Sequence, residues 1–212
     1  MPRKLTTIIR ELSKSVRESH KLAADAYNWS VASPPSARPL VSPKRRAWLI
    51  ELAFFRAFSA WEAFVEEAFI LYLMGQQAPR GRAARRYGFP PSEDAAREWV
   101  NDGKVYTTWS TEQVMRRAKR LFRNGHPFHG ALSANQHNLG QAKTVRNAIA
   151  HHSEDAWLKF QSLVRNELAA FPPDMTVGSF LMMTKPHTTP PISYFEHYLD
   201  QIAQTADRII PT

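Results

Sequence analysis

The residues best suited to chemistry in this sequence are Arg146, Asn147 and His151, which lie in the stretch RNAIAH at residues 146–151. Histidine can accept and return a proton near neutral pH, and the planar guanidinium of arginine can hold two oxygens of a phosphate group. Asparagine can orient either partner by a hydrogen bond. Together these side chains suit acid–base chemistry at a phosphate group.

Apolar periodicity places this stretch near the C-terminal end of a helix over residues 136–152. Asn147 and His151 are four residues apart and share one face, but Arg146 and His151 are about 140° apart around the helix. The two therefore flank a site instead of pointing together. The three polar residues are not needed for the core, because the buried side is expected to consist of Leu139, Ala142, Val145 and Ile149.

These residues also have a purely structural interpretation. Arg146 would form an ion pair, Asn147 would cap a nearby backbone group, and His151 would be a polar residue at a helix end. Glu62 is a further candidate, because it lies at helical spacing within an aromatic stripe, where a carboxylate needs a partner. The other members of this stripe are Phe55, Phe58, Val65 and Phe69. A structural ion pair would satisfy Glu62 too.

The common enzyme motifs are missing from the sequence. It contains no glycine-rich phosphate loop, no His-Glu-x-x-His, no Gly-x-Ser-x-Gly and no EF-hand loop. Of the eight histidines, His126 and His129 lie three residues apart, but no carboxylates accompany them in a metal-binding pattern. We therefore expect neither a metal site nor a cofactor.

The elements that position these residues are predicted to be helices. An amphipathic helix is expected over residues 4–29, and four prolines make residues 31–46 a linker. Residues 48–74 are apolar almost all round and predict a central core helix. A membrane span is the competing interpretation, but the charged residues spread through this stretch would be costly in lipid.

Shorter helices are expected further along the chain, without a convincing strand or repeat. Ser110 is a candidate N-cap for a helix that ends before Gly125, and residues 153–155 suit the start of another helix. The predicted ranges are about 92–101, 111–124, 136–152, 154–171 and 192–210. The fold class is therefore all-α, an elaborated helical bundle. We expect three parts: an N-terminal helix (1–30), the linker (31–46) and a helical domain (47–212) with a basic insertion at about 75–125.

Positive charge is concentrated in two parts of the chain, whose formal net charge is +9. Residues 1–46 carry 10 basic and 3 acidic side chains, and residues 75–125 carry 11 and 5. Such uneven charge fits an anionic partner, with nucleic acid first, although a solvated basic surface is the alternative. The expected RNA-binding residues are Arg82, Arg85, Arg86, Arg116, Arg117, Lys119, Arg120 and Arg123.

Composition places the protein among ordinary globular chains, with 43% hydrophobic and 22% charged residues in a length of 212. A wholly disordered or fibrous protein is excluded. The chain has no cysteine, so disulfides and thiol catalysis are excluded, and nothing requires an oxidising compartment. The basic N-terminal segment lacks the apolar run of a signal peptide. We expect a cytoplasmic protein.

The stretch RNAIAH resembles the Arg-Asn-x-x-x-His signature of HEPN domains. The flanking sequences RAFSAWEAFVEEAF and SEDAWLKFQSLV resemble the neighbouring helices of the RiboL-PSP-HEPN branch. The resemblance covers roughly residues 48–208 and is strongest at 138–160. It implies an all-helical domain that pairs as a homodimer across the motif helix. It also implies a metal-independent endoribonuclease that leaves a 2′,3′-cyclic phosphate, in a toxin–antitoxin, antiviral or RNA-processing role.

This resemblance adds expectations about the site and its partners. A twofold axis would bring a second copy of Arg146 and His151 into the same cleft, and Glu62 would pair with Arg146 or His151. An antitoxin protein is a further candidate partner. In HEPN toxins that are silenced by modification of a tyrosine two residues after the histidine, that tyrosine is required, whereas this chain has Ser153. Two rivals stay open: a catalytically silent helical dimer that binds RNA or a partner protein, and an interaction module built on residues 4–29.

Overall fold

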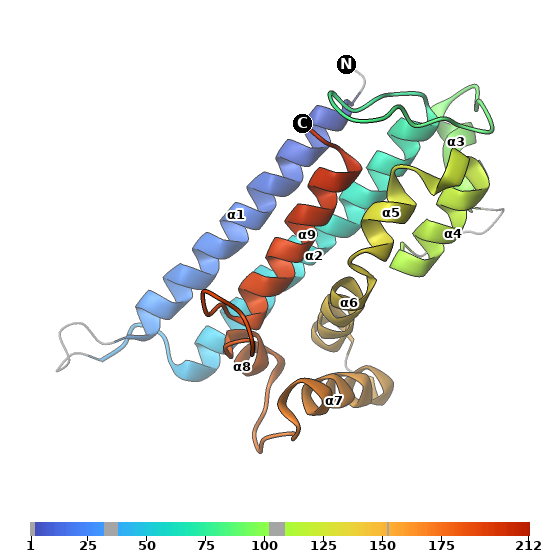
Figure 1. Cartoon of the computed structure of the whole chain (residues 1–212). Helices are drawn as coiled ribbons and strands as arrows, with labels where there is room; N and C mark the ends of the chain where they lie inside the picture. Colours follow the sequence, from blue (N-terminus) through green and yellow to red (C-terminus); the bar gives the residue numbers. More distant parts are fainter. Residues whose placement is uncertain (1–2, 32–37, 102–108, 152) are drawn as a thin grey trace. The chain divides into compact units, whose positions relative to one another are not determined.

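The computed structural model describes residues 3–31, 38–101, 109–151 and 153–212 (Figure 1). Regular structure in these residues is helical, as predicted, apart from two isolated β-bridges. Within the described ranges, no helix is both long and apolar enough to span a membrane. The chain forms two compact units: unit 1 comprises residues 1–13, 60–137 and 202–212, and unit 2 comprises residues 14–59 and 138–201.

Three long helices contribute residues to both units: α1 (Leu5–Ser30), α2 (Pro43–Leu73) and α9 (Tyr194–Ile209). The other helices fall mainly into one unit. Unit 1 holds α3 (Glu93–Asn101), α4 (Thr111–Leu121), a short 3₁₀ turn (Arg123–Gly125) and α5 (Phe128–Ser133). Unit 2 holds nearly all of α6 (Gln136–Ala150), with α7 (Glu154–Leu168) and α8 (Val177–Met182).

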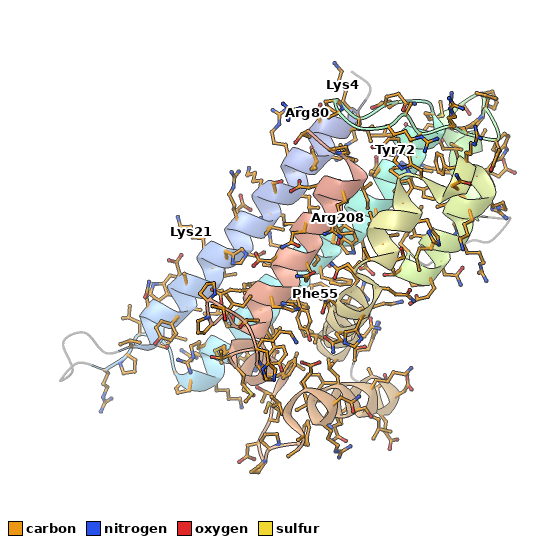
Figure 2. All side chains as sticks on the ribbon, viewed as in Figure 1. Lys4, Lys21, Phe55, Tyr72, Arg80 and Arg208 are labelled. Carbon is orange, nitrogen blue, oxygen red and sulfur yellow. The ribbon has the colours of Figure 1, made fainter. Side chains whose placement is uncertain are left out.

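The core of unit 1 is built around aromatic rings. Phe69 and Tyr72 of α2 pack on Phe128 of α5, with ring centroids 4.8 and 5.7 Å apart. The hydroxyl of buried Tyr72, labelled in Figure 2, donates to the carbonyl oxygen of Ile209 at 2.6 Å, which satisfies its only polar group. The apolar side of the first part of α1 is buried as well, at Leu5, Ile8, Ile9 and Leu12. This burial counts against using that face to bind a partner helix.

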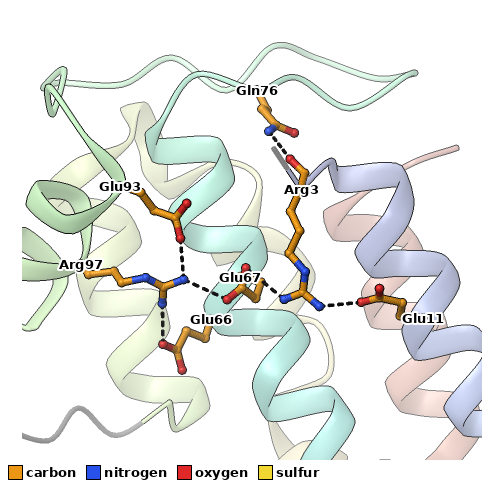
Figure 3. A network of polar contacts seen from close by, with 7 residues as sticks. All are labelled: Arg3, Glu11, Glu66, Glu67, Gln76, Glu93 and Arg97. Carbon is orange, nitrogen blue, oxygen red and sulfur yellow. Dashed lines mark hydrogen bonds and ion pairs between the residues drawn. The ribbon is translucent and has the colours of Figure 1, made fainter. Parts of the chain in front are cut away.

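A charged network joins α1, α2 and α3 in unit 1 (Figure 3). The Arg97 guanidinium lies 3.0, 2.9 and 2.8 Å from the carboxylates of three glutamates. Arg3 bridges Glu67, which Arg97 also contacts, at 3.4 Å and a fourth carboxylate, Glu11, at 2.9 Å. Because these groups are partly exposed, they orient the helices more than they stabilise them. The members are Arg3, Glu11, Glu66, Glu67, Gln76, Glu93 and Arg97.

The core of unit 2 brings α8 onto the start of α2. A Cβ atom on Gly178 would lie 2.4 Å from the carbonyl oxygen of Ala47, so the two backbones are in direct contact. The Gly178 N–H donates to the Glu51 carboxylate at 2.7 Å, and burial nevertheless raises the pKa of Glu51. Phe180 stacks on Tyr194 at 4.3 Å, which attaches α8 to α9.

Several helix boundaries differ from the prediction for local reasons. α2 begins at Pro43 instead of residue 48, because Ser42 accepts the Arg45 N–H and proline is compatible with the first helical position. α4 has the predicted N-cap at Ser110 but ends at Leu121, since extended Phe122 pairs with Arg86. The short helices α5 and α8 were not predicted.

Candidate functional site

The three motif residues lie at the C-terminal end of α6, in unit 2. Arg146 and Asn147 are half-buried, and His151 is exposed just beyond the last residue of the helix. The His151 N–H still donates to the Asn147 carbonyl at 2.9 Å, so these two residues share the last turn, as predicted. Of the four residues predicted to be buried, Leu139, Ala142 and Val145 are buried, whereas Ile149 is only half-buried.

Two contacts orient the Arg146 side chain. Its Nη1 donates to Asn147 Oδ1 at 3.1 Å, and its guanidinium carbon lies 5.8 Å from the centre of the Phe55 ring of α2, labelled in Figure 2. An aromatic face attracts a cation and reduces its freedom. Asn147 and Phe55 therefore restrict the guanidinium on the same part of unit 2 that carries His151. Phe55 was known from the sequence only as a member of the aromatic stripe.

Glu62, the fourth predicted site residue, belongs to unit 1. It is half-buried on α2 and has polar interactions of its own. Its pairing with Arg146 or His151 stays a prediction.

A polar network that the sequence did not predict holds α6 in place. Glu167 of α7 accepts hydrogen bonds from Gln141 of α6 at 2.5 Å, from Lys185 at 2.9 Å and from Tyr194 of α9 at 3.0 Å. His197 Nε2 lies 3.2 Å from Asn138 Oδ1 of α6. The sequence indicates this network in one way only: Gln141 is a polar residue next to Ala142, on the side of the helix that is predicted to be buried. This network fixes the helix that carries the motif.

Burial and charge change two pKa values in this network. Burial alone would raise the pKa of Glu167, but the hydrogen bonds from Lys185, Gln141 and Tyr194 and the charge of Lys185 lower it below its ordinary value. The pKa of His197 is lowered, chiefly by burial and next by the Lys185 charge, against the opposing effect of Glu167. Folding therefore favours ionised Glu167 and neutral His197.

Acid is expected to destabilise the protein partly through His197. Below the ordinary pKa of 6.5 the unfolded chain binds a proton at this histidine that the folded chain resists, so stability is lost as pH falls. Ionised Glu167 also contributes to stability, and this contribution is lost at still lower pH, when the pH falls through the depressed pKa of its carboxyl group. Thermal melts of wild type and His197→Gln between pH 7.5 and 5.5 test this, with exposed His137→Gln as control. If the melting temperature depended on pH equally in all three proteins, His197 would not be the group responsible.

Two basic segments within the predicted insertion, residues 80–86 and residues 116–123, meet in unit 1. Residue 86 forms a β-bridge with Phe122, and the Arg123 N–H donates to the Arg85 carbonyl at 2.8 Å. The loop after α2 is thereby attached to the end of α4. Six of the eight predicted RNA-binding residues are exposed here: Arg82, Arg85, Arg116, Lys119, Arg120 and Arg123.

A small cavity of about 50 Å³ lies where the two segments join. Arg82, Arg85 and Arg123 line it together with His126 and two uncharged residues, so no carboxylate takes part in its lining. His126 Nε2 lies 2.9 Å from the Arg82 carbonyl oxygen, which fixes this edge of the loop. Three guanidinium groups around a small cavity suit a phosphate group. We call Arg82, Arg85 and Arg123 the arginine cluster.

Two of the predicted RNA-binding residues have packing roles. Arg86 donates to the Leu73 carbonyl at 2.7 Å at the end of α2, and its guanidinium lies 4.7 Å from the centre of the Phe89 ring. Arg117 is half-buried, with its guanidinium 5.4 Å from the centre of the Trp109 ring. These contacts hold Arg86 and Arg117 against their own unit.

Within the residues that the structure describes, no group of three or more histidine and acidic side chains is placed to hold a metal ion. His152, which adjoins the motif, lies outside the described residues. Comparison with known proteins assigns no family: no protein-family model, curated protein or solved structure matches this chain.

Proposed function

We propose that this protein is a metal-independent endoribonuclease of HEPN type that acts as a homodimer. The observation that carries the proposal is the placement of Arg146, Asn147 and His151. Arg146 and Asn147 are half-buried and joined by a hydrogen bond in the last turn of α6, and exposed His151 follows just beyond the end of that helix. A toxin or antiviral-defence role follows from the sequence resemblance to HEPN domains.

Each residue type has a role in the proposed reaction. His151 takes the proton of the substrate 2′-hydroxyl, whose oxygen then attacks phosphorus. The bond from phosphorus to the 5′-oxygen breaks, and that oxygen receives a proton, leaving a 2′,3′-cyclic phosphate and a 5′-hydroxyl end. Arg146 binds the phosphate oxygens as negative charge builds up, and Asn147 holds the guanidinium in position. Glu62 is proposed as the partner of Arg146 or His151.

The direct test is cleavage of RNA in the absence of metal. Purified protein is incubated with tRNA and with total RNA in EDTA, and fragments are separated by gel electrophoresis. The proposal expects discrete fragments whose yield grows with protein concentration. Intact RNA under all conditions, with protein that is folded and binds RNA, would contradict it.

Exposed apolar residues in unit 2, which carries the motif, support the homodimer. Ile149 of α6 was expected to be buried but is only half-buried, and Leu158 of α7 is 51% exposed. On α2, Leu52 is 56% exposed and lies one turn before Phe55, which contacts Arg146. Contiguous exposed apolar patches are typical of interaction surfaces, and we propose that these residues belong to one. A second copy of the chain would cover them.

Leu158→Glu is expected to shift the protein from dimer to monomer, because it places a charge in the proposed interface. Light scattering after size-exclusion chromatography measures the mass, and cleavage is expected to fall with the dimer fraction. Lys159→Glu, one residue further along the exposed surface of α7, is the matched control. A monomeric wild type that cleaves RNA would contradict the dimer.

The exposed arginine cluster favours one alternative, a catalytically silent module that binds RNA. Replacing Arg82, Arg85 and Arg123 together by alanine is expected to weaken RNA binding. It should also flatten the dependence of log affinity on log salt by about 0.7 for each phosphate group that the variant no longer binds. Arg208→Ala is the control, because Arg208, labelled in Figure 2, is exposed and lies outside the arginine cluster. Salt-sensitive binding that survives His151→Ala, with no cleavage by wild type, would favour the silent module.

A further inference from the structure

A cavity of about 430 Å³ lies within unit 2, enclosed by α1, the start of α2, α8 and the start of α9. Its volume is in the range of pockets that hold small organic ligands. The cavity exists because α1 presents Ala23 and Ala24 to it, between the larger side chains of His20 and Tyr27. The methyl side chains of these two alanines leave space that longer side chains would fill.

The inner wall of this cavity is apolar. Ile50 of α2, Leu181 of α8 and Phe195 of α9 are buried and line it. The His20 ring meets Phe195 edge to face at 5.7 Å, which fixes one side of the wall. Such a surface binds the hydrocarbon or ring part of a ligand by removing apolar area from water.

Arg46 supplies the charge at the rim. Its Nη1 donates to Ser30 Oγ at 3.0 Å, and its guanidinium carbon lies 5.8 Å from the centre of the Tyr27 ring. Its Nε is buried without a hydrogen-bond acceptor, and within the described parts of the chain no carboxylate pairs with Arg46. A buried donor without an acceptor is costly, so the geometry favours a ligand that brings one.

The acidic residue that lines the same cavity is already engaged. Glu196 Oε2 accepts the N–H and the hydroxyl of Ser193, each at 2.7 Å, and the Glu196 N–H donates back to Ser193 Oγ at 3.2 Å. This reciprocal pair caps the start of α9. The Glu196 charge is thus held at a helix N-terminus, which stabilises a negative charge, and it does not neutralise Arg46.

We propose that this cavity binds an organic anion with an apolar, ring-containing body and one acidic group. The body occupies the space beside Ala23 against Ile50, Leu181 and Phe195, and the acidic group accepts hydrogen bonds from Arg46. This site is independent of the proposed ribonuclease activity, so each proposal can fail without the other.

Two fluorescent probes that differ by one charge test the site. 8-Anilinonaphthalene-1-sulfonate carries a sulfonate, and N-phenyl-1-naphthylamine has the same rings without it. The wild-type chain is expected to bind the anionic probe about tenfold more tightly or better, because a hydrogen bond to a charged group is worth that factor. This comparison needs no variant, and equal affinity for the two probes would overturn the proposal.

Three variants locate the binding. Arg46→Met is expected to weaken the anionic probe about tenfold and leave the neutral probe nearly unchanged. Ala23→Leu fills the cavity and should weaken both probes. Arg45→Met, an exposed neighbour that does not line the cavity, should change neither. Anionic-probe affinity that is the same in Arg46→Met and Arg45→Met would place binding elsewhere and overturn the proposal.

Discussion

Replacing His151 by alanine is expected to lower the rate of RNA cleavage by about 10²–10⁴-fold, the contribution of a positioned general acid–base group. The fold should be unaffected, because His151 is exposed and lies just beyond the end of α6. Its backbone N–H, which donates to the Asn147 carbonyl, is retained in the variant. A loss of activity would therefore reflect the imidazole and not the helix.

Initial rates on labelled RNA, with circular dichroism as the check of folding, measure this effect. His137→Ala removes an exposed histidine at the start of the same helix and should retain the wild-type rate. Arg146→Lys keeps the charge but loses the planar fork, so it should also be strongly impaired. Wild-type activity in His151→Ala would remove this residue from the mechanism.

Replacing Gly178 by alanine is expected to destabilise unit 2, because the added methyl group would clash with the backbone of α2. The new Cβ would lie 2.4 to 2.8 Å from backbone atoms of Ala47, which no side-chain rotation can relieve. α8 would have to move away from α2, and the bond from the Gly178 N–H to Glu51 would be strained. Overpacking of this kind costs about 1–3 kcal/mol.

Gly140→Ala is the matched control for Gly178→Ala, because it adds the same methyl group to a helix of the same unit. A Cβ on Gly140 would meet nothing within 4 Å, and alanine in a helix interior is favoured over glycine by about 0.5–1 kcal/mol. In urea unfolding followed by circular dichroism, the midpoint should therefore fall for Gly178→Ala and rise for Gly140→Ala. Equal stability of Gly178→Ala and wild type would contradict the contact between α8 and α2.

Features with a strong local cause were predictable from the sequence. The all-helical class follows from repeated apolar spacing, and Ser110 and Ser153 act as the expected N-caps of α4 and α7. The exposure of Arg116, Lys119, Arg120 and Arg123 also follows from helical spacing. Six-residue helices such as α5 and α8 were missed, because they are too short to show a period.

Features that depend on distant residues were not predictable. The bridge between residue 86 and Phe122 joins the two basic segments, and no local pattern marks it. Likewise Glu167, Lys185 and Gln141 meet only after folding, since they come from separate parts of unit 2. The motif residues were identified by type and spacing, but the contact of Arg146 with Phe55 required the structure.

The chemistry of the RNA ends tests the central claim most directly. Wild-type protein is incubated with a defined RNA in EDTA, and the fragments are analysed by mass spectrometry. Attack by the 2′-hydroxyl, with His151 moving the proton and Arg146 binding the phosphate, predicts 2′,3′-cyclic phosphate and 5′-hydroxyl ends. Fragments that carry 3′-hydroxyl and 5′-phosphate ends would contradict this mechanism.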